Sequence, residues 1–197
     1  MKKTMKFYSM MTIVAILFSV IANAQHVNFG IKGGLNLYKI SNYENSKYDT
    51  KPGVHFGILG HIHLNHSIAV QPELVYSSQG AKYRAGGTNY RLNLGYINAP
   101  VMLQYMFANG FRLEAGPQLG FLINAKSVVN NKSVDVKSGY KSVDVGAGIG
   151  AGYFKQSIGL GAGLRYNIGL SNINESNSVK TTNQGFQLSV FYQFKHK

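Results

Sequence analysis

The chain has 197 residues, enough for one domain, with 45% hydrophobic residues, 12% aromatic residues and 23 glycines. Its mean hydropathy is −0.08, so the composition excludes both a disordered chain and a bundle of membrane-spanning helices. The formal net charge is +13 at pH 7, and the absence of cysteine excludes disulfides and thiolate metal sites.

The N-terminal segment has the order of a secretory signal peptide. Three lysines within the first six residues precede an apolar run over residues 10–22, which ends in the A-x-A sequence of residues 22–24. A membrane-spanning helix needs about 20 apolar residues, and this run is shorter. We therefore predict a signal peptide over residues 1–24 and an exported domain over residues 25–197.

The positive charge of an exported chain does not point to nucleic acid, which such a chain does not meet routinely. We expect outer-membrane lipid and the phosphates of lipopolysaccharide as its counter-charge. Nine of the lysines fall in or directly beside segments that we predict below to be loops. They are Lys39, Lys47, Lys51, Lys82, Lys126, Lys132, Lys137, Lys141 and Lys180.

After residue 24 the chain shows a period of two. In the first segment Val27, Phe29 and Ile31 alternate with Asn28, Gly30 and Lys32, and the pattern recurs eight times between turn residues. The segments span residues 27–37, 54–64, 68–77, 94–107, 111–124, 143–153, 158–168 and 186–194. The sequence therefore predicts eight β-strands and an all-β fold.

The predicted connections alternate in length. Those near residues 65, 109 and 155 are short, and Asn109-Gly110 is a hairpin signal. Those at 40–52, 79–92, 125–141 and 171–184 are long and polar. Short turns at one end and long loops at the other are typical of an eight-stranded antiparallel up-and-down transmembrane β-barrel in the outer membrane of a Gram-negative bacterium.

One face of the predicted strands is apolar, and the other carries glycine and charge. A soluble barrel would bury the apolar face and leave an unusually glycine-rich face in water. We expect the reverse orientation, with lipid on the apolar face and an interior in which three acids neutralise three bases. The predicted interior charge network consists of Lys32, Glu73, Arg112, Glu114, Asp144 and Arg165.

Two segments, residues 95–105 and 113–120, resemble the PorT family of outer-membrane β-barrels. The residues that carry the resemblance are Tyr96, Asn98, Pro100, Gln104, Tyr105, Gly116 and Pro117. Asn98 stands where the family usually has an inward Glu, and Gln104 where it has Lys, so the interior charge would stay balanced. The resemblance implies an outer-membrane barrel. The founding member assists a secretion system, and we do not carry that role over to this chain.

Two further patterns bear on metals and cofactors. His55, His61 and His63 share a face, which would suit zinc or nickel, but no carboxylate lies near them in sequence, and such histidines more often line a wet lumen. Residues 146–151 match a loose G-x-G-x-x-A pattern without the helix that dinucleotide binding requires. We predict no metal and no cofactor.

The sequence favours a non-enzymatic barrel with a plugged polar interior and long loops that contact a protein partner. It is expected to meet the barrel-insertion machinery during assembly. A small channel or transporter along the glycine-lined wall, or a secretion accessory, is the alternative. A hydrolase is less favoured, because the loop acids, such as Glu44 and Glu175, have no histidine beside them in sequence.

Overall fold

The computed structural model describes residues 27–42, 48–85, 87–130, 132–176 and 180–194. The predicted signal peptide, residues 1–24, lies outside this part of the chain. The strands are β1 (Val27–Asn42), β2 (Tyr48–His63), β3 (Ile68–Ala85), β4 (Thr88–Met106), β5 (Phe111–Val129), β6 (Lys132–Asp135), β7 (Val143–Lys155), β8 (Leu160–Gly169) and β9 (Thr181–Gln193). A short 3-10 helix, η1 (Lys137–Gly139), follows β6. No helix in the described ranges is long and apolar enough to cross a membrane.

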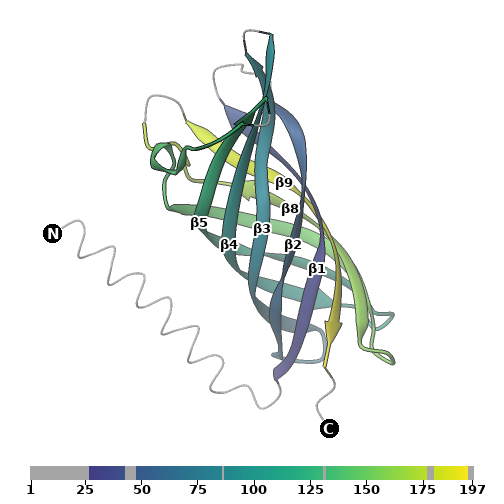
Figure 1. Cartoon of the computed structure of the whole chain (residues 1–197). Helices are drawn as coiled ribbons and strands as arrows, with labels where there is room; N and C mark the ends of the chain where they lie inside the picture. The colour runs from purple at the N-terminus through teal and green to yellow at the C-terminus, as the bar shows by residue number, and fades with distance from the viewer. Residues whose placement is uncertain (1–26, 43–47, 86, 131, 177–179, 195–197) are drawn as a thin grey trace, which may run out of the picture.

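Eight of these strands form a closed antiparallel ring (Figure 1). The order around the ring is β1, β2, β3, β4, β5, β7, β8 and β9. The ring closes where β9 pairs with β1, from Gly30 opposite Gln193 to Asn42 opposite Thr181. The short β6 pairs with the end of β5 and lies outside the ring. The predicted eight-stranded antiparallel barrel is confirmed.

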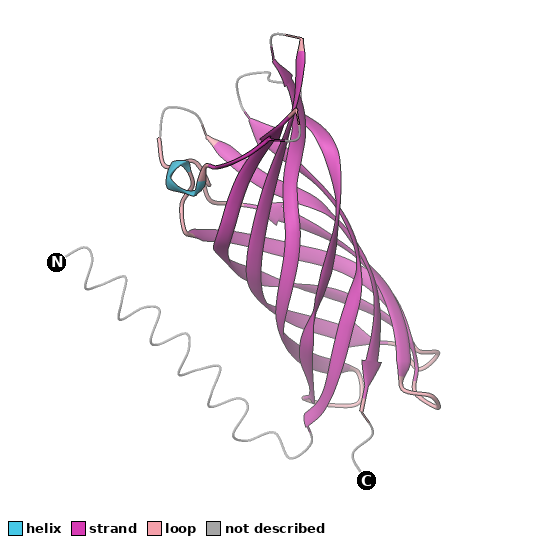
Figure 2. Cartoon of the chain, viewed as in Figure 1, coloured by secondary structure: helices cyan, strands magenta, loops and turns pink. Residues whose placement is uncertain are grey.

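The two ends of the barrel differ, as Figure 2 shows. Tight turns over residues 64–67, 107–110 and 156–159 lie at one end, which we call the short-turn end. Gly110 has φ = +91° in one of these turns, which fits the predicted Asn-Gly hairpin. The segment with η1 and the segment between β8 and β9 lie at the other end, the long-loop end.

Alternate side chains of each strand point outward, and around the middle of the barrel these are the apolar ones. In β1, Ile31 and Leu35 are 51% and 60% exposed, whereas Lys32 is 8% exposed. The same order holds in β5, where Leu113 is exposed and Arg112 is buried. The predicted orientation, with the apolar face outward, is confirmed for these strands.

The strands extend further at the long-loop end than we predicted. Residues 79–92 were expected to form a loop, but β3 continues to Ala85 and β4 begins at Thr88. The outward residues of this hairpin, among them Lys82 and Arg91, are polar, so the apolar half of the alternation is missing there. A strand surrounded by water needs no apolar outer face.

Lys51 is a second difference, because we predicted it in a loop. It lies in β2 and is 6% exposed. It lies four positions before the buried His55, with Pro52 and Val54 exposed between them, so the alternation of β2 turns its side chain inward. Its Nζ donates to Gln79 O at 3.0 Å and to Ser78 Oγ at 3.3 Å. The period of two gives its face correctly, and the prediction failed because β2 begins at Tyr48 rather than at residue 54.

Candidate functional site

Four charged side chains converge in the middle of the lumen. Lys32 comes from β1, Glu73 from β3, Glu114 from β5 and Arg165 from β8. Because alternate residues of each strand face inward, strands on different sides of the ring bring these groups together. The side chains of Glu73, Arg165 and Lys32 are 0%, 3% and 5% exposed.

Glu73 is the centre of this group. Lys32 Nζ lies 3.1 Å from both of its carboxylate oxygens. Arg165 donates from Nη2 to Oε1 at 2.8 Å and from Nη1 to Oε2 at 3.1 Å, a two-bond geometry that suits guanidinium and carboxylate. Gln71 Nε2 also donates to Oε1, at 2.8 Å. These donors satisfy the buried charge of Glu73.

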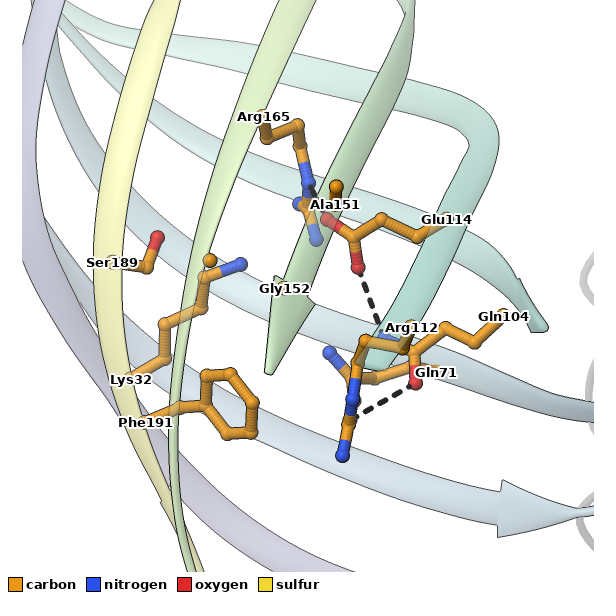
Figure 3. A pocket seen from close by; sticks show the side chains of 11 residues that line it. Lys32, Gln71, Gln104, Arg112, Glu114, Ala151, Gly152, Arg165, Ser189 and Phe191 are labelled. Carbon is orange, nitrogen blue, oxygen red and sulfur yellow. Dashed lines mark hydrogen bonds and ion pairs between the residues drawn. The ribbon is translucent and has the colours of Figure 1, made fainter. Parts of the chain in front are cut away.

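Glu114 links this group to a second layer nearer the short-turn end (Figure 3). Its Oε1 accepts from Arg165 Nε at 2.7 Å, and its Oε2 accepts from Gln104 Nε2 at 2.9 Å. Gln104 Oε1 in turn accepts from Arg112 Nη1 at 3.3 Å. Gln104 therefore stands between the carboxylate of Glu114 and the guanidinium of Arg112.

The Arg112 guanidinium is held mainly by aromatic rings. Its Cζ lies 4.6 Å from the centre of the Phe154 ring and 5.1 Å from that of Phe191. The residue is 4% exposed. Its Nε has no hydrogen-bond partner, and no carboxylate in the described residues forms an ion pair with it.

Asp144, the sixth member of the predicted network, does not join the other five. It accepts from Ser171 Oγ at 2.6 Å, near the start of β7 at the long-loop end. The β7 residue opposite Arg112 is Gly152, eight positions further along, or about 26 Å at the rise of a strand. The remaining network has three bases and two acids. We had predicted three of each, so its charges do not cancel.

Glycines on the inner wall make room for these side chains. A Cβ on Gly150 would lie 3.0 Å from Glu114 Oε1, and one on Gly148 would lie 3.1 Å from Arg165 Cδ. Beside Gly152 and Gly163 a cavity of about 20 Å³ remains (Figure 3). A cavity of this size holds about one water molecule.

The histidines take part in separate contacts. His55 bonds to Asn36 Oδ1 at 2.7 Å and to Ser189 Oγ at 2.9 Å, whereas the rings of His61 and His63 meet edge to face at 4.5 Å. His61 Nδ1 lies 3.3 Å from Gln71 Oε1, which ties it to the Glu73 group. Within the described ranges, no three His, Cys, Asp or Glu side chains are grouped to hold a metal ion.

An apolar cluster, which we call the lid, closes the lumen at the long-loop end. Ile173, from the segment between β8 and β9, is 0% exposed at its centre. Backbone bonds of 2.8 and 2.9 Å to Lys141 and Thr181 hold this residue in place. The buried members are Ile40, Ala81, Leu92, Leu94, Tyr96, Leu122, Ala125 and Ile173. Our sequence interpretation missed the lid.

The lumen is open at the short-turn end. A cavity of about 820 Å³, which we call the vestibule, reaches from the turns to Arg112, His61 and Gln193. Phe154 and Phe194 are among the aromatic residues of its wall. The interior thus has an open polar end, a hydrogen-bonded middle and an apolar lid.

The residues that carry the PorT resemblance divide between the two faces. Tyr96 belongs to the lid, Gln104 bridges Arg112 and Glu114, and Tyr105 points outward at 50% exposure. Gly116 allows close packing, because its Cβ would lie 2.0 Å from Val101 O. Asn98 and Pro100 are buried, and Pro117 is exposed. Asn98 and Gln104 are six residues apart on one strand, about 20 Å, so they do not form a contacting pair.

A closed ring of strands with an apolar outer wall and a charged interior defines an integral β-barrel of an outer membrane. Residues 23–175 match the family model described as outer membrane protein beta-barrel domain, and the chain belongs to that family. The protein is therefore located in the outer membrane of a Gram-negative bacterium. In outer-membrane barrels generally, short turns face the periplasm and long loops face the outside of the cell.

Two solved structures have a similar fold. Neisserial surface protein A (NspA) is 17% identical with a TM-score of 0.54, and the match covers 86% of this chain and 100% of that one. Ail, the attachment invasion locus protein of Yersinia pestis, is 13% identical with a TM-score of 0.55 and the same coverage. At these identities the likeness concerns the fold. No curated protein matches the sequence.

Proposed function

We propose that this protein is a non-enzymatic outer-membrane barrel that conducts nothing and presents an extracellular binding surface. The observation that carries the proposal is the filled lumen. The Glu73 group occupies its middle, and the lid closes its extracellular end. The water-sized cavity beside Gly152 gives no path for a solute.

Planar-bilayer recordings test the plug. We expect no stable unitary current from the wild-type protein. Steady currents that disappear when Gly148 or Gly161 is replaced by a bulky residue would replace this proposal with the channel or transporter alternative. A matched control is Gly139→Ala, because a Cβ at that position meets no atom within 4 Å.

The binding surface that we propose is the outward side of the β3–β4 hairpin. Lys82 lies directly opposite Arg91, and Arg84 lies two positions beyond Lys82. Like charges that face each other across two strands repel, and in the described residues no carboxylate forms an ion pair with any of them. Asp49, opposite Lys82, is the acidic residue in the hollow of about 580 Å³ that these cations line.

Phosphate groups of lipopolysaccharide fit this surface, because they are anionic and surround the extracellular part of an outer-membrane barrel. We expect the double variant Lys82→Gln/Arg91→Gln to bind fluorescent lipopolysaccharide about tenfold more weakly in nanodiscs. Lys155→Gln, in β7 at the periplasmic end, is the control and should bind as the wild type does. Equal binding of dephosphorylated lipopolysaccharide would contradict the proposal.

The proposal also includes three narrower assignments. We infer export by a signal peptide cleaved after Ala24, assembly by the barrel-insertion machinery and a relation to the PorT family within the wider barrel family. The support for the first and third is the sequence of residues 10–24 and of residues 95–105. N-terminal sequencing of the mature protein tests the cleavage site, and any start other than Gln25 would correct it.

A further inference from the structure

The vestibule differs from the rest of the interior in its charge. Arg112, Lys155 and three histidines line it, and no acidic side chain of the described residues does. Four of the described acids lie at the long-loop end: Asp49, Asp135, Asp144 and Glu175. The other two, Glu73 and Glu114, are bonded to Lys32, Arg165 and Gln104. The cavity is open to the periplasm and electropositive.

Arg112 forms the floor of this cavity and is the one base of the described charge network without an ion pair. Lys32 is paired with Glu73, and Arg165 is paired with Glu73 and Glu114, so no carboxylate is in direct contact with Arg112. A buried charge without a partner is costly. The Phe154 and Phe191 rings and one bond to Gln104 stabilise the guanidinium only in part.

Two donors at the floor are left without acceptors. Arg112 Nε and Gln193 Nε2 are both buried, and neither has a hydrogen-bond partner among the described residues. Both residues line the vestibule, and both are 4% exposed. Buried donors in folded proteins are almost always satisfied, so these two point to an acceptor that enters from the cavity.

We propose that the vestibule floor binds a small oxyanion, a carboxylate or phosphate group, between Arg112 and Gln193. The planar guanidinium donates through several N–H groups and binds such oxygens in pairs. The aromatic contacts fix the plane of the Arg112 guanidinium, and the open end of the barrel admits the anion from the periplasm. This site is independent of the extracellular surface proposed above.

The test is a titration of the folded, full-length mature protein in nanodiscs with sodium phosphate and, separately, sodium acetate. Sodium chloride at equal ionic strength is the salt control. The readout is the ¹⁵Nε resonance of Arg112, assigned by its loss in Arg112→Gln. We expect a saturable shift with phosphate, acetate or both, and a higher urea midpoint of unfolding at saturation. A response to one anion alone identifies the ligand group.

Three variants make the test specific. Arg112→Gln should fold, because it removes an unpaired buried charge, and its urea midpoint should no longer respond to the anion. Arg112→Lys keeps the charge without the planar donor pair and should bind about tenfold more weakly. Lys137→Gln, in η1 at the opposite end, removes one exposed positive charge outside both proposed sites and should bind as the wild type does. No saturable shift in the wild type, or an unchanged anion response in Arg112→Gln, would overturn the proposal.

Discussion

The polar part of the barrel and its extension at the long-loop end place the same residue types on opposite faces. Toward the short-turn end of β4, Gln104 points inward at 1% exposure and Leu103 points outward at 56%. In the extension of the same strand, Leu92 and Leu94 are buried inside, and Arg91 is exposed outside. One part of β4 therefore has polar side chains inside and apolar ones outside, and the other part has the reverse.

The difference shows which solvent surrounds each part. Lipid makes an apolar outer wall favourable and leaves the interior to polar groups that satisfy one another. Above the membrane, water surrounds the barrel, and the hydrophobic effect restores the order of a soluble protein, with apolar side chains inside. The change between Leu94 and Gln104 marks the transition between the two environments in β4.

The largest effect is expected in the polar middle. Glu73→Leu leaves Lys32 and Arg165 without their shared carboxylate, so we expect the free energy of unfolding in lipid vesicles to fall by about 3–5 kcal/mol. Urea titration monitored by circular dichroism measures it. The double variant Lys32→Met/Glu73→Leu should recover part of the loss. A single variant as stable as the wild type would mean that the interior charges do not depend on one another.

A smaller and local effect is expected in the apolar extension. Ile173→Ala removes the centre of the lid, so the free energy of opening the lid should fall by about 2–4 kcal/mol, with the barrel below it unaffected. Hydrogen exchange of the amides of Lys141 and residue 173, compared with those of β4, measures the difference. The control is Leu170→Ala, because Leu170 is 57% exposed. Equal loosening of β4 would show that the two regions are not separate.

The smallest effect concerns Tyr140, which packs against the lid outside the membrane. Burial raises the pKa of its hydroxyl from 10.0 to about 12. An unfolded segment would ionise this group at a lower pH, so the lid should lose stability as the pH rises from 10 to 12 and change little below 10. Hydrogen exchange of the lid in Tyr140→Phe should lack this dependence. The same pH profile in both proteins would exclude Tyr140 as its cause.

The sequence predicted the strand count, the outward face and five of the residues that line the polar interior. These follow from the period of two, which states the face on which a residue lies. The period does not state the depth of a residue along the barrel, because depth depends on the stagger between strands. Asp144 was therefore assigned to the correct face but grouped with residues that lie about 20–26 Å further along the barrel.

Other features had weaker signals. Ile173 is a single apolar residue within the polar sequence of residues 171–176, and only its packing shows that it belongs to the lid. The hairpin that carries Lys82 and Arg91 alternates, but with a polar outer face, so it resembles a loop in composition. The proposed anion site depends on which residue of the charge network has no ion pair. Identifying that residue requires the position of every network residue along the barrel axis.

The contact between β1 and β9 has a consequence for biogenesis. The first strand of the ring has as its second neighbour the last strand of the ring in sequence order, β9. Until β9 arrives, β1 presents a free row of backbone donors and acceptors, which is a template for pairing with other chains. Pairing with β9 covers this row, so closure of the ring removes the exposed edge of β1.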